Sequence, residues 1–258
     1  MNQQPWEVIS ALLEREELPA LDQYLQSLPT SETVRAVFRL TPDEQEKLLT
    51  LLPPESAADI IDDVPDAQAA ELLDNLEPGE AASIVNEMDS DEAADVLAEM
   101  DREDVEEILR LMDADEAAEA RQLIDYDPET AGGLMMKEYL SYPEATAVAD
   151  AVADIAVRGE DYPIYYLQHL FVVGPLGRLQ GVAGLTDIVG ARPQARLAEL
   201  ATRVDAINAS AGLDQLEEFF ESRDTPIAPV VDDSGRLLGA IRRRAVFDAI
   251  SERSDESY

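Results

Sequence analysis

A 12-residue repeat runs through the first half of the chain, and it limits the possible fold more than any other feature. Each repeat holds a large apolar residue, then a small residue, then an aliphatic pair, as in Leu52, Ala57 and Ile60-Ile61. Sequence repeats of fixed length predict small structural units that stack on their neighbours. The large apolar positions are Leu40, Leu52, Val64, Leu76, Met88, Met100, Met112 and Ile124.

Each repeat predicts one short helix of two to three turns. Proline, serine or aspartate follows most of the large apolar residues, and these residues suit the first turn or the N-cap of a helix. Helices this short are marginal in water by themselves, so they must stack around a shared core. We therefore expect residues 1–125 to form a superhelix of short helices, with residues 1–39 as its helical cap. The remaining positions carry acids that we expect on the outer face: Asp59, Glu71, Asp95, Glu107 and Glu119.

The acidic charge gathers in the same region. Residues 40–124 have a net charge of −23 and residues 125–258 a net charge of −11, out of −37 for the whole chain. A chain this acidic is unsuited to nucleic acid or to an anionic membrane surface, because both attract clustered lysine and arginine. We therefore exclude nucleic acid as a partner.

Several other classes of protein are also excluded. The chain has no cysteine and a single histidine, His169, which excludes thiolate zinc sites and mechanisms that need two histidines. We find no phosphate-binding glycine loop, nucleophile elbow or other catalytic constellation, and predict that the chain is not an enzyme. The apolar runs are shorter than the roughly 20 residues of a membrane span. We expect a soluble intracellular region.

The second half of the chain contains a duplicated strand–turn–strand pattern. Residues 170–182 and 228–240 lie 58 residues apart, and both contain the pattern V-V-x-x-x-G-R-L-x-G. A helical stretch comes before and after each copy. This order predicts two α+β units in tandem, which we place at residues 126–192 and 193–258.

The duplicated hairpin resembles a pair of CBS domains, and the order of segments resembles one family more closely. An acidic helical repeat, the junction D-P-E-T-A-G-G-L-M at residues 127–135 and a CBS pair together resemble the cytosolic region of MgtE-type magnesium transporters. The resemblance covers nearly the whole chain. It implies an N-terminal superhelix of short helices followed by a tandem CBS pair.

The resemblance also implies a function. In this family the helical domain and the CBS pair bind several Mg²⁺ ions between them, and the compact form closes a transmembrane pore. The family works as a homodimer through its CBS domains, at the cytoplasmic face of the cell membrane. We thus expect a Mg²⁺-sensing regulatory region whose partner is the pore domain of the same transporter, which is absent from these 258 residues.

Six acids are candidate Mg²⁺ ligands, because Mg²⁺ takes carboxylate oxygens and retains several waters. Asp91 and Asp95 lie four residues apart, on one helix face, next to Glu92. The alternative for these three is a solvated helix face. The resemblance adds Asp214, Asp224 and Asp248. The alternatives are an N-cap for Asp214 and simple exposure for Asp248. Family members often have further acids where this chain has residues 242–245, which read R-R-R-A.

One residue is a candidate for binding an adenine nucleotide such as ATP. CBS pairs often bind nucleotides through an aspartate after a G-h-h-S/T-x-x pattern, and residues 181–187 read G-V-A-G-L-T-D. Asp187 matches the aspartate, whereas Gly184 replaces the hydroxyl residue. The alternative for Asp187 is a helix cap. His169 lies in a predicted strand near this candidate nucleotide site and is expected to be a packed or surface residue.

Two other functions remain open. The chain can be a stand-alone CBS regulatory protein that binds an adenine nucleotide or a protein partner. It can also be a scaffold from a salt-loving organism, since only Lys47 and Lys137 accompany 17 arginines. High-salt adaptation alone does not explain why most of the excess negative charge lies in residues 40–124.

Overall fold

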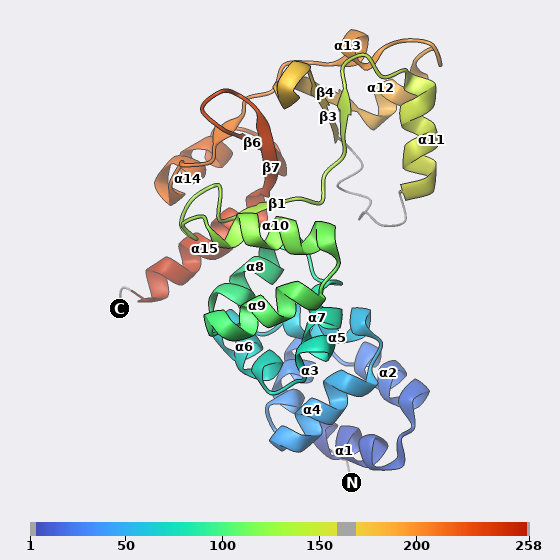
Figure 1. The fold of residues 1–258 in the computed structure, drawn as a ribbon, viewed down its shortest axis with the longest axis vertical. Helices are drawn as coiled ribbons and strands as arrows, with labels where there is room; N and C mark the ends of the chain where they lie inside the picture. The colour runs from blue at the N-terminus through green and yellow to red at the C-terminus, as the bar shows by residue number, and fades with distance from the viewer. Residues whose placement is uncertain (1–3, 159–168, 257–258) are drawn as a thin grey trace. The chain divides into compact units, whose positions relative to one another are not determined.

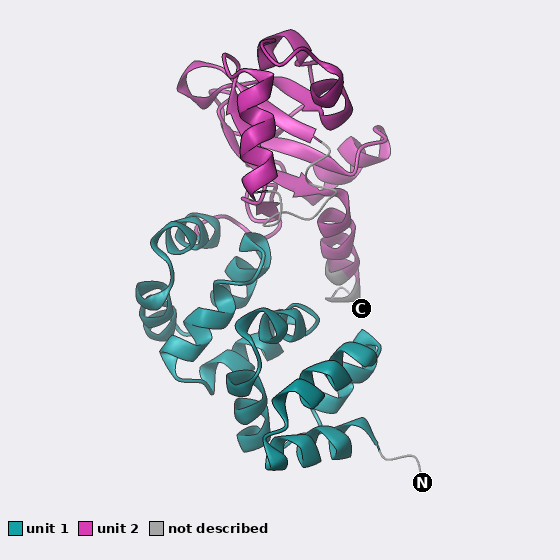
Figure 2. Ribbon diagram, turned by 90° about the vertical axis from the view of Figure 1, so that its right-hand side faces the viewer, with its two compact units in different colours: residues 1–124 teal, residues 125–258 magenta. Residues whose placement is uncertain are grey.

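The structure is a computed structural model that describes residues 4–158 and 169–256. It forms two compact units, unit 1 with residues 1–124 and unit 2 with residues 125–258 (Figure 2). Among the described residues, no helix combines the length and the apolar character needed to cross a membrane.

Unit 1 is a stack of short helices, which confirms the predicted superhelix (Figure 1). The helices α4 to α10 begin at residues 42, 54, 66, 78, 90, 102 and 114, every 12 residues. The helices of the described part of this unit are α1 (Pro5–Arg15), α2 (Leu18–Ser27), α3 (Thr30–Val37), α4 (Pro42–Leu51), α5 (Pro54–Asp62), α6 (Asp66–Asp74), α7 (Pro78–Val85), α8 (Ser90–Ala98), α9 (Arg102–Leu111) and α10 (Ala114–Ile124).

The repeat sequence explains both the ends and the packing of these helices. Thr41 caps α4 because its Oγ1 accepts a hydrogen bond from the Glu44 amide at 3.4 Å, while Glu44 accepts one from the Thr41 amide at 2.8 Å. From α5 onward each helix packs on the second one along the chain. One continuous apolar core extends from Ile9 in α1 to Ala120 in α10, so the first 39 residues do belong to the same stack.

Unit 2 contains two small mixed sheets with the same internal order. In each sheet a parallel strand pair is followed by an antiparallel hairpin, and both hairpins have a register shift, at Val172/Val173 and at Val230/Val231. These shifts lie 58 residues apart, at equivalent positions of the duplicated pattern, and confirm the tandem pair. The strands are β1 (Met135–Met136), β2 (Ser141–Pro143), β3 (His169–Val173), β4 (Leu179–Gly184), β5 (Ile207–Asn208), β6 (Ile227–Val231) and β7 (Leu237–Arg242).

Helices flank these sheets, close to where the sequence predicts them. Helix α14 precedes the second hairpin and α15 follows it, as the sequence predicts. The helices of the described part of unit 2 are α11 (Val148–Arg158), the 3₁₀ turn η2 (Pro175–Gly177), α12 (Leu185–Gly190), α13 (Leu197–Leu200), α14 (Leu213–Glu221) and α15 (Arg243–Glu256).

The two sheets exchange short segments. Strand β1, near the start of the first CBS unit, pairs with β7 of the second, and Thr202, near the start of the second unit, pairs with Val182 in β4 of the first. The last glycine of each duplicated pattern allows this close approach. A Cβ at Gly239 would lie 2.7 Å from the Met135 Sδ atom, and one at Gly181 would overlap the carbonyl oxygen of Thr202.

Candidate metal-binding and nucleotide-binding residues

The unit 1 candidates lie in the first half of α8. Asp89 is the N-cap, and Asp91 and Glu92 follow in the first turn, where negative side chains interact favourably with the helix dipole. Asp91 is only 4% exposed, while Glu92 and Asp95 are half-buried. The alternative of a solvated helix face is therefore wrong for Asp91.

Acids of α8 face an acid from the end of α5. The pKa of Asp62 is raised from 3.8 to about 8, first by removal from water and then by the charges of Glu92, Asp89, Asp59 and Asp63. Asp62 nevertheless keeps more than a third of its surface exposed, so solvent screens part of this repulsion. Carboxylates brought together in this way favour a proton or a metal cation between them.

The same arrangement returns 12 residues further along. Burial raises the pKa of Asp74 at the end of α6, and the charges of Asp104 and Asp101 at the start of α9 raise it further. We call the six acids of these two contacts the facing acids: Asp62, Asp74, Asp89, Glu92, Asp101 and Asp104. Their arrangement is a property of the repeat, because the end of one helix meets the start of the third helix after it.

A third contact of this kind has an amide in place of the first acid. The Asn86 Oδ1 atom, 12 residues after Asp74, accepts a hydrogen bond from the Asp113 amide at 3.2 Å. The residue at this repeat position can thus cap a helix three elements away. Asp62 and Asp74 are not among the candidates predicted from the sequence, although Asp62, Asp74 and Asn86 follow one another at the 12-residue spacing of the repeat.

Two of the three unit 2 candidates are bound to arginines. Asp214 accepts a hydrogen bond from Arg253 of α15 at 2.7 Å, and Asp248 accepts one from Arg244 at 3.2 Å. Gly212 is the N-cap of α14 and Asp214 lies in the first turn, so the N-cap alternative for Asp214 is wrong. The third candidate, Asp224, is exposed in the loop between α14 and β6.

The described residues contain no group of three or more acidic or histidine side chains with the geometry of a complete metal site. This agrees with the chemistry of Mg²⁺, which needs only one or two protein carboxylates and completes its shell with water.

The nucleotide candidate lies at the start of a short helix. Asp187 is exposed in the first turn of α12, whose N-cap residue is Gly184, so the helix-cap alternative for Asp187 stays open. A Cβ at Gly184 would lie 3.1 Å from the Asp187 Oδ2 atom, so the carboxylate folds over this glycine. His169 pairs with Gly184 across β3 and β4. Its Nδ1 atom is buried and has no hydrogen-bond partner within the described residues.

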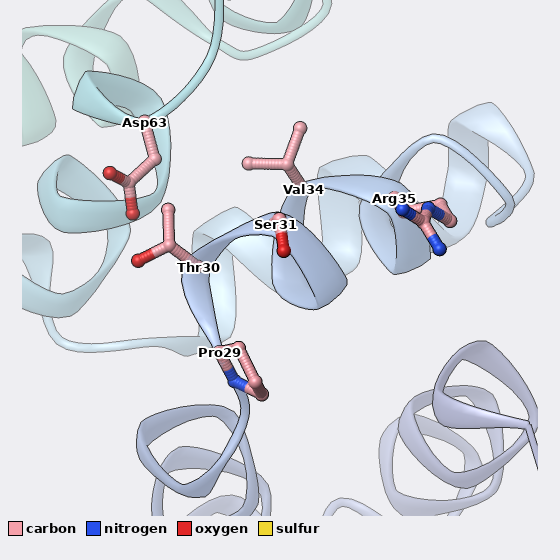
Figure 3. Close-up of a pocket in the computed structure, with 6 residues that line it drawn as sticks. All are labelled: Pro29, Thr30, Ser31, Val34, Arg35 and Asp63. Carbon is pink, nitrogen blue, oxygen red and sulfur yellow. The ribbon is translucent and has the colours of Figure 1, made fainter.

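A hollow of about 670 Å³ lies elsewhere in unit 1, at the start of α3 (Figure 3). Thr30 and Asp63 come near each other at one end, and the Arg35 side chain points away from them (Figure 3). None of the candidate metal ligands lines this hollow. The lining residues are Pro29, Thr30, Ser31, Val34, Arg35 and Asp63.

A superhelix of short helices followed by a tandem CBS pair is the class of protein that the fold defines. Comparison with known proteins narrows this class. Residues 12–129 match the family of the MgtE intracellular N domain, and residues 198–252 match the CBS domain family. The chain therefore has the domain composition of the cytosolic region of an MgtE-type magnesium transporter.

Known proteins with these domains are similar to this chain. The magnesium transporter MgtE of Thermus thermophilus is 30% identical over 132 residues, and that of Bacillus subtilis is 26% identical over 134 residues. Each match covers about half of this chain, 51% and 52%, and 29% of the relative. The matched segment thus spans less than a third of the length of these transporters.

Two solved structures share the fold over almost the whole chain. The soluble part of a magnesium transporter has a TM-score of 0.82 at 23% identity, and covers 96% of this chain and 98% of its own. The cytosolic domain of the Mg²⁺ channel MgtE in complex with ATP has a TM-score of 0.81 at 27% identity, and covers 93% of this chain and 98% of its own.

Proposed function

We propose that this chain is the Mg²⁺-sensing cytosolic region of an MgtE-type magnesium transporter. Mg²⁺ binding to carboxylates of both units favours a compact form, and this form closes the pore of the transporter. The region acts as a homodimer through its CBS domains at the cytoplasmic face of the membrane. The observation that carries the proposal is the match of residues 12–129 to the MgtE intracellular N domain, and the contact of Asp62 with Glu92 and Asp89 of α8 supports it as a place where carboxylates lie together.

The proposed ligands in unit 1 are Asp91, Glu92 and Asp95. Divalent ions bind hard oxygen donors, and each bound Mg²⁺ offsets two of the negative charges on this acidic helix. A ligand shifts a conformational equilibrium only through its differential affinity for the two states. A form in which carboxylates are held close together has that differential affinity for Mg²⁺.

The proposed ligands in unit 2 are Asp214, Asp224 and Asp248, and they are not equivalent. Arg253 and Arg244 already neutralise Asp214 and Asp248, so Mg²⁺ must compete with a guanidinium at both positions. We therefore propose that Asp224 contributes more to Mg²⁺ binding than Asp214 or Asp248.

Small-angle scattering during a Mg²⁺ titration tests the function. At constant ionic strength, millimolar Mg²⁺ is expected to reduce the radius of gyration, and Asp91→Asn with Asp95→Asn is expected to move the midpoint to higher Mg²⁺. Asp224→Ala is expected to do the same, whereas Asp205→Ala is the matched control because Asp205 is paired with Arg223 at 2.9 Å. The proposal fails if monovalent salt of equal ionic strength produces the same compaction.

A second ligand is proposed for the same region, an adenine nucleotide at Asp187. It is supported by the ATP complex of the 27% identical MgtE cytosolic domain and by the position of Asp187 at the start of α12. ATP is expected to raise the melting temperature of the wild-type chain and to have less effect on Asp187→Ala. Asp150→Ala is the control, since Asp150 is also an exposed acid in the first turn of a helix, α11. Equal loss of the ATP effect in both variants would contradict the assignment.

A further inference from the structure

The turns of the two CBS hairpins lie against each other in unit 2. Arg178 and Arg236 are bridge partners in an antiparallel arrangement, and the Leu179 amide donates a hydrogen bond to the Gly235 carbonyl at 3.0 Å. This hydrogen bond flanks the bridge, so the two arginines form a non-hydrogen-bonded pair. Side chains of such pairs are on the same face and closer than at any other position of an antiparallel ladder.

Each arginine covers the opposite turn. A Cβ at Gly235 would lie 3.7 Å from the Arg178 Nη2 atom, and one at Gly177 would lie 3.4 Å from the Arg236 Cγ atom. Both arginines are exposed. Two like charges directly opposite each other in a ladder are destabilising, so this arrangement acts against the stability of the fold.

In the described part of unit 2, the positive charges of Arg178 and Arg236 are not offset by ion pairs with acids, whereas those of other arginines are. Arg223, Arg244 and Arg253 each have a carboxylate oxygen within 3.2 Å. Among the side chains that the structure describes, no carboxylate lies within ion-pair distance of Arg178 or Arg236.

One acid, Asp232, interacts with the charge of Arg236, but its carboxylate is hydrogen-bonded within its own turn. The Asp232 Oδ1 atom accepts hydrogen bonds from the Ser234 amide, the Ser234 hydroxyl and the Arg236 amide, at 2.8, 2.7 and 2.9 Å. These bonds lower the pKa of Asp232, with a smaller contribution from the charge of Arg236. Asp232 thus holds the backbone of the turn, and the guanidinium groups remain available to another anion.

The first turn also contains backbone strain. Leu176 has φ 63° and ψ 20°, a left-handed conformation that is unfavourable for a large side chain, and it is 89% exposed. Strain of this kind persists only where the surrounding structure enforces it, and it gathers at functional positions. Here it occurs two residues before Arg178.

We propose that Arg178 and Arg236 form a binding site for a small oxyanion of the phosphate type. Two guanidinium groups on one face offer several N–H donors to the oxygens of one tetrahedral dianion. The anion also removes the repulsion between the arginines, so binding and turn stability are coupled. The site uses residues different from the candidate Mg²⁺ ligands and from Asp187, and it does not depend on the proposed function.

Inorganic phosphate and NMR of the backbone amides test the site in the whole chain. Phosphate is expected to shift the amides of residues 174–179 and 232–237 and to raise the melting temperature, whereas chloride of equal ionic strength does neither. Arg178→Gln and Arg236→Gln are each expected to weaken phosphate binding about tenfold, since each removes a charge-assisted contact. Arg223→Gln is the control, because Arg223 is already paired with Asp205.

The stability of the same variants gives an independent test. Without phosphate, Arg178→Gln is expected to raise the melting temperature, because it removes the like-charge pair. In phosphate this advantage over the wild type disappears. The proposal is overturned if chloride reproduces the amide shifts, or if phosphate binds Arg178→Gln and wild type equally. A phosphate response that Asp187→Ala abolishes would also overturn it, because the anion would then occupy the nucleotide candidate.

Discussion

Several acidic side chains of unit 1 lie next to other acids, whereas several in unit 2 lie next to arginines. In unit 1 the acids at the end of one helix meet acids at the start of another, and burial together with these neighbouring charges raises the pKa values of Asp62 and Asp74. In unit 2 the acids meet arginines, as in the pairs Asp205–Arg223 and Asp214–Arg253. The difference teaches that net charge alone does not locate electrostatic repulsion; packing does, where it brings carboxylates together as at Asp62 and Asp74.

The units also differ in how they are held together. Unit 1 is a stack in which most helices from α5 onward pack on the second helix along the chain. Unit 2 depends on backbone segments far apart in sequence, since Met135 and Met136 of β1 pair with Ile241 and Ala240 of β7. A substitution at a point of close backbone approach in unit 2 should therefore reduce the free energy of unfolding much more than a substitution on the surface of unit 1.

The largest expected effect follows from Gly181, where a Cβ would overlap the Thr202 carbonyl and lie 2.9 Å from its carbon atom. Gly181→Ala is expected to reduce the free energy of unfolding of unit 2 by about 3 kcal/mol, because backbone cannot move aside as a flexible side chain can. Amide hydrogen exchange in β3 and β4 measures this loss in unit 2.

Two controls accompany this prediction. Fluorescence of Trp6, the single tryptophan, reports on unit 1 and should not change. Gly190→Ala is the matched glycine variant, because a Cβ there meets nothing within 4 Å. If Gly190→Ala were as destabilising as Gly181→Ala, the close approach would not be the cause.

A middle-sized effect is expected from Asp62. Its folded pKa of about 8 is above the value of 3.8 for a free side chain, so the folded chain binds this proton more tightly than the unfolded chain does. The stability of unit 1 should therefore fall as pH rises from about 4 to 8, and stay at its lower value above that. Asp62→Asn should stabilise unit 1 at pH 8 by about 1 kcal/mol, a figure reduced for solvent screening.

Urea unfolding followed by Trp6 fluorescence at pH 5 and pH 8 measures this change. The gain should be smaller at pH 5, where Asp62 is largely protonated and the charges of Glu92 and Asp89 act on a neutral group. Asp43→Asn is the control, since Asp43 lies in the first turn of α4 and is not among the acids that raise the pKa of Asp62. An equal gain at both pH values would argue against repulsion as the cause.

The sequence predicts unit 1 better than unit 2 for a physical reason. Short-range periodicity determines where each helix begins, and the starts at residues 42 to 114 follow the repeat without a slip. The exchange of β1 and Thr202 between the sheets could not be predicted, because two-residue strands show no alternation and their partners lie far away in sequence.

Among the candidate site residues, too, some contacts can be predicted from the local sequence and others cannot. The pairing of Asp91 and Asp95 on one helix face follows from their spacing of four residues. The contact of Asp62 with α8 and the pairing of Asp214 with Arg253 depend on packing between elements about 30 and 39 residues apart, which no local pattern reports. Whether an acid meets another acid or an arginine is decided by that packing.

The smallest expected effect, and the sharpest test of the comparison, is the response to salt. Arg253→Gln removes the partner of Asp214 in an exposed ion pair, with side-chain exposures of 39% and 85%, so it should destabilise unit 2 only slightly. That cost should shrink in 1 M salt, which screens attraction.

Salt should have the opposite effect on unit 1, where it screens the repulsion between facing acids such as Asp62 and Glu92 and so raises stability. Parallel salt series on the wild type and on both variants, Arg253→Gln and Asp62→Asn, separate the two effects. If salt shifted both units in the same direction, hydrophobic or general ionic effects would dominate, and the contrast between facing acids and paired acids would lose its energetic meaning.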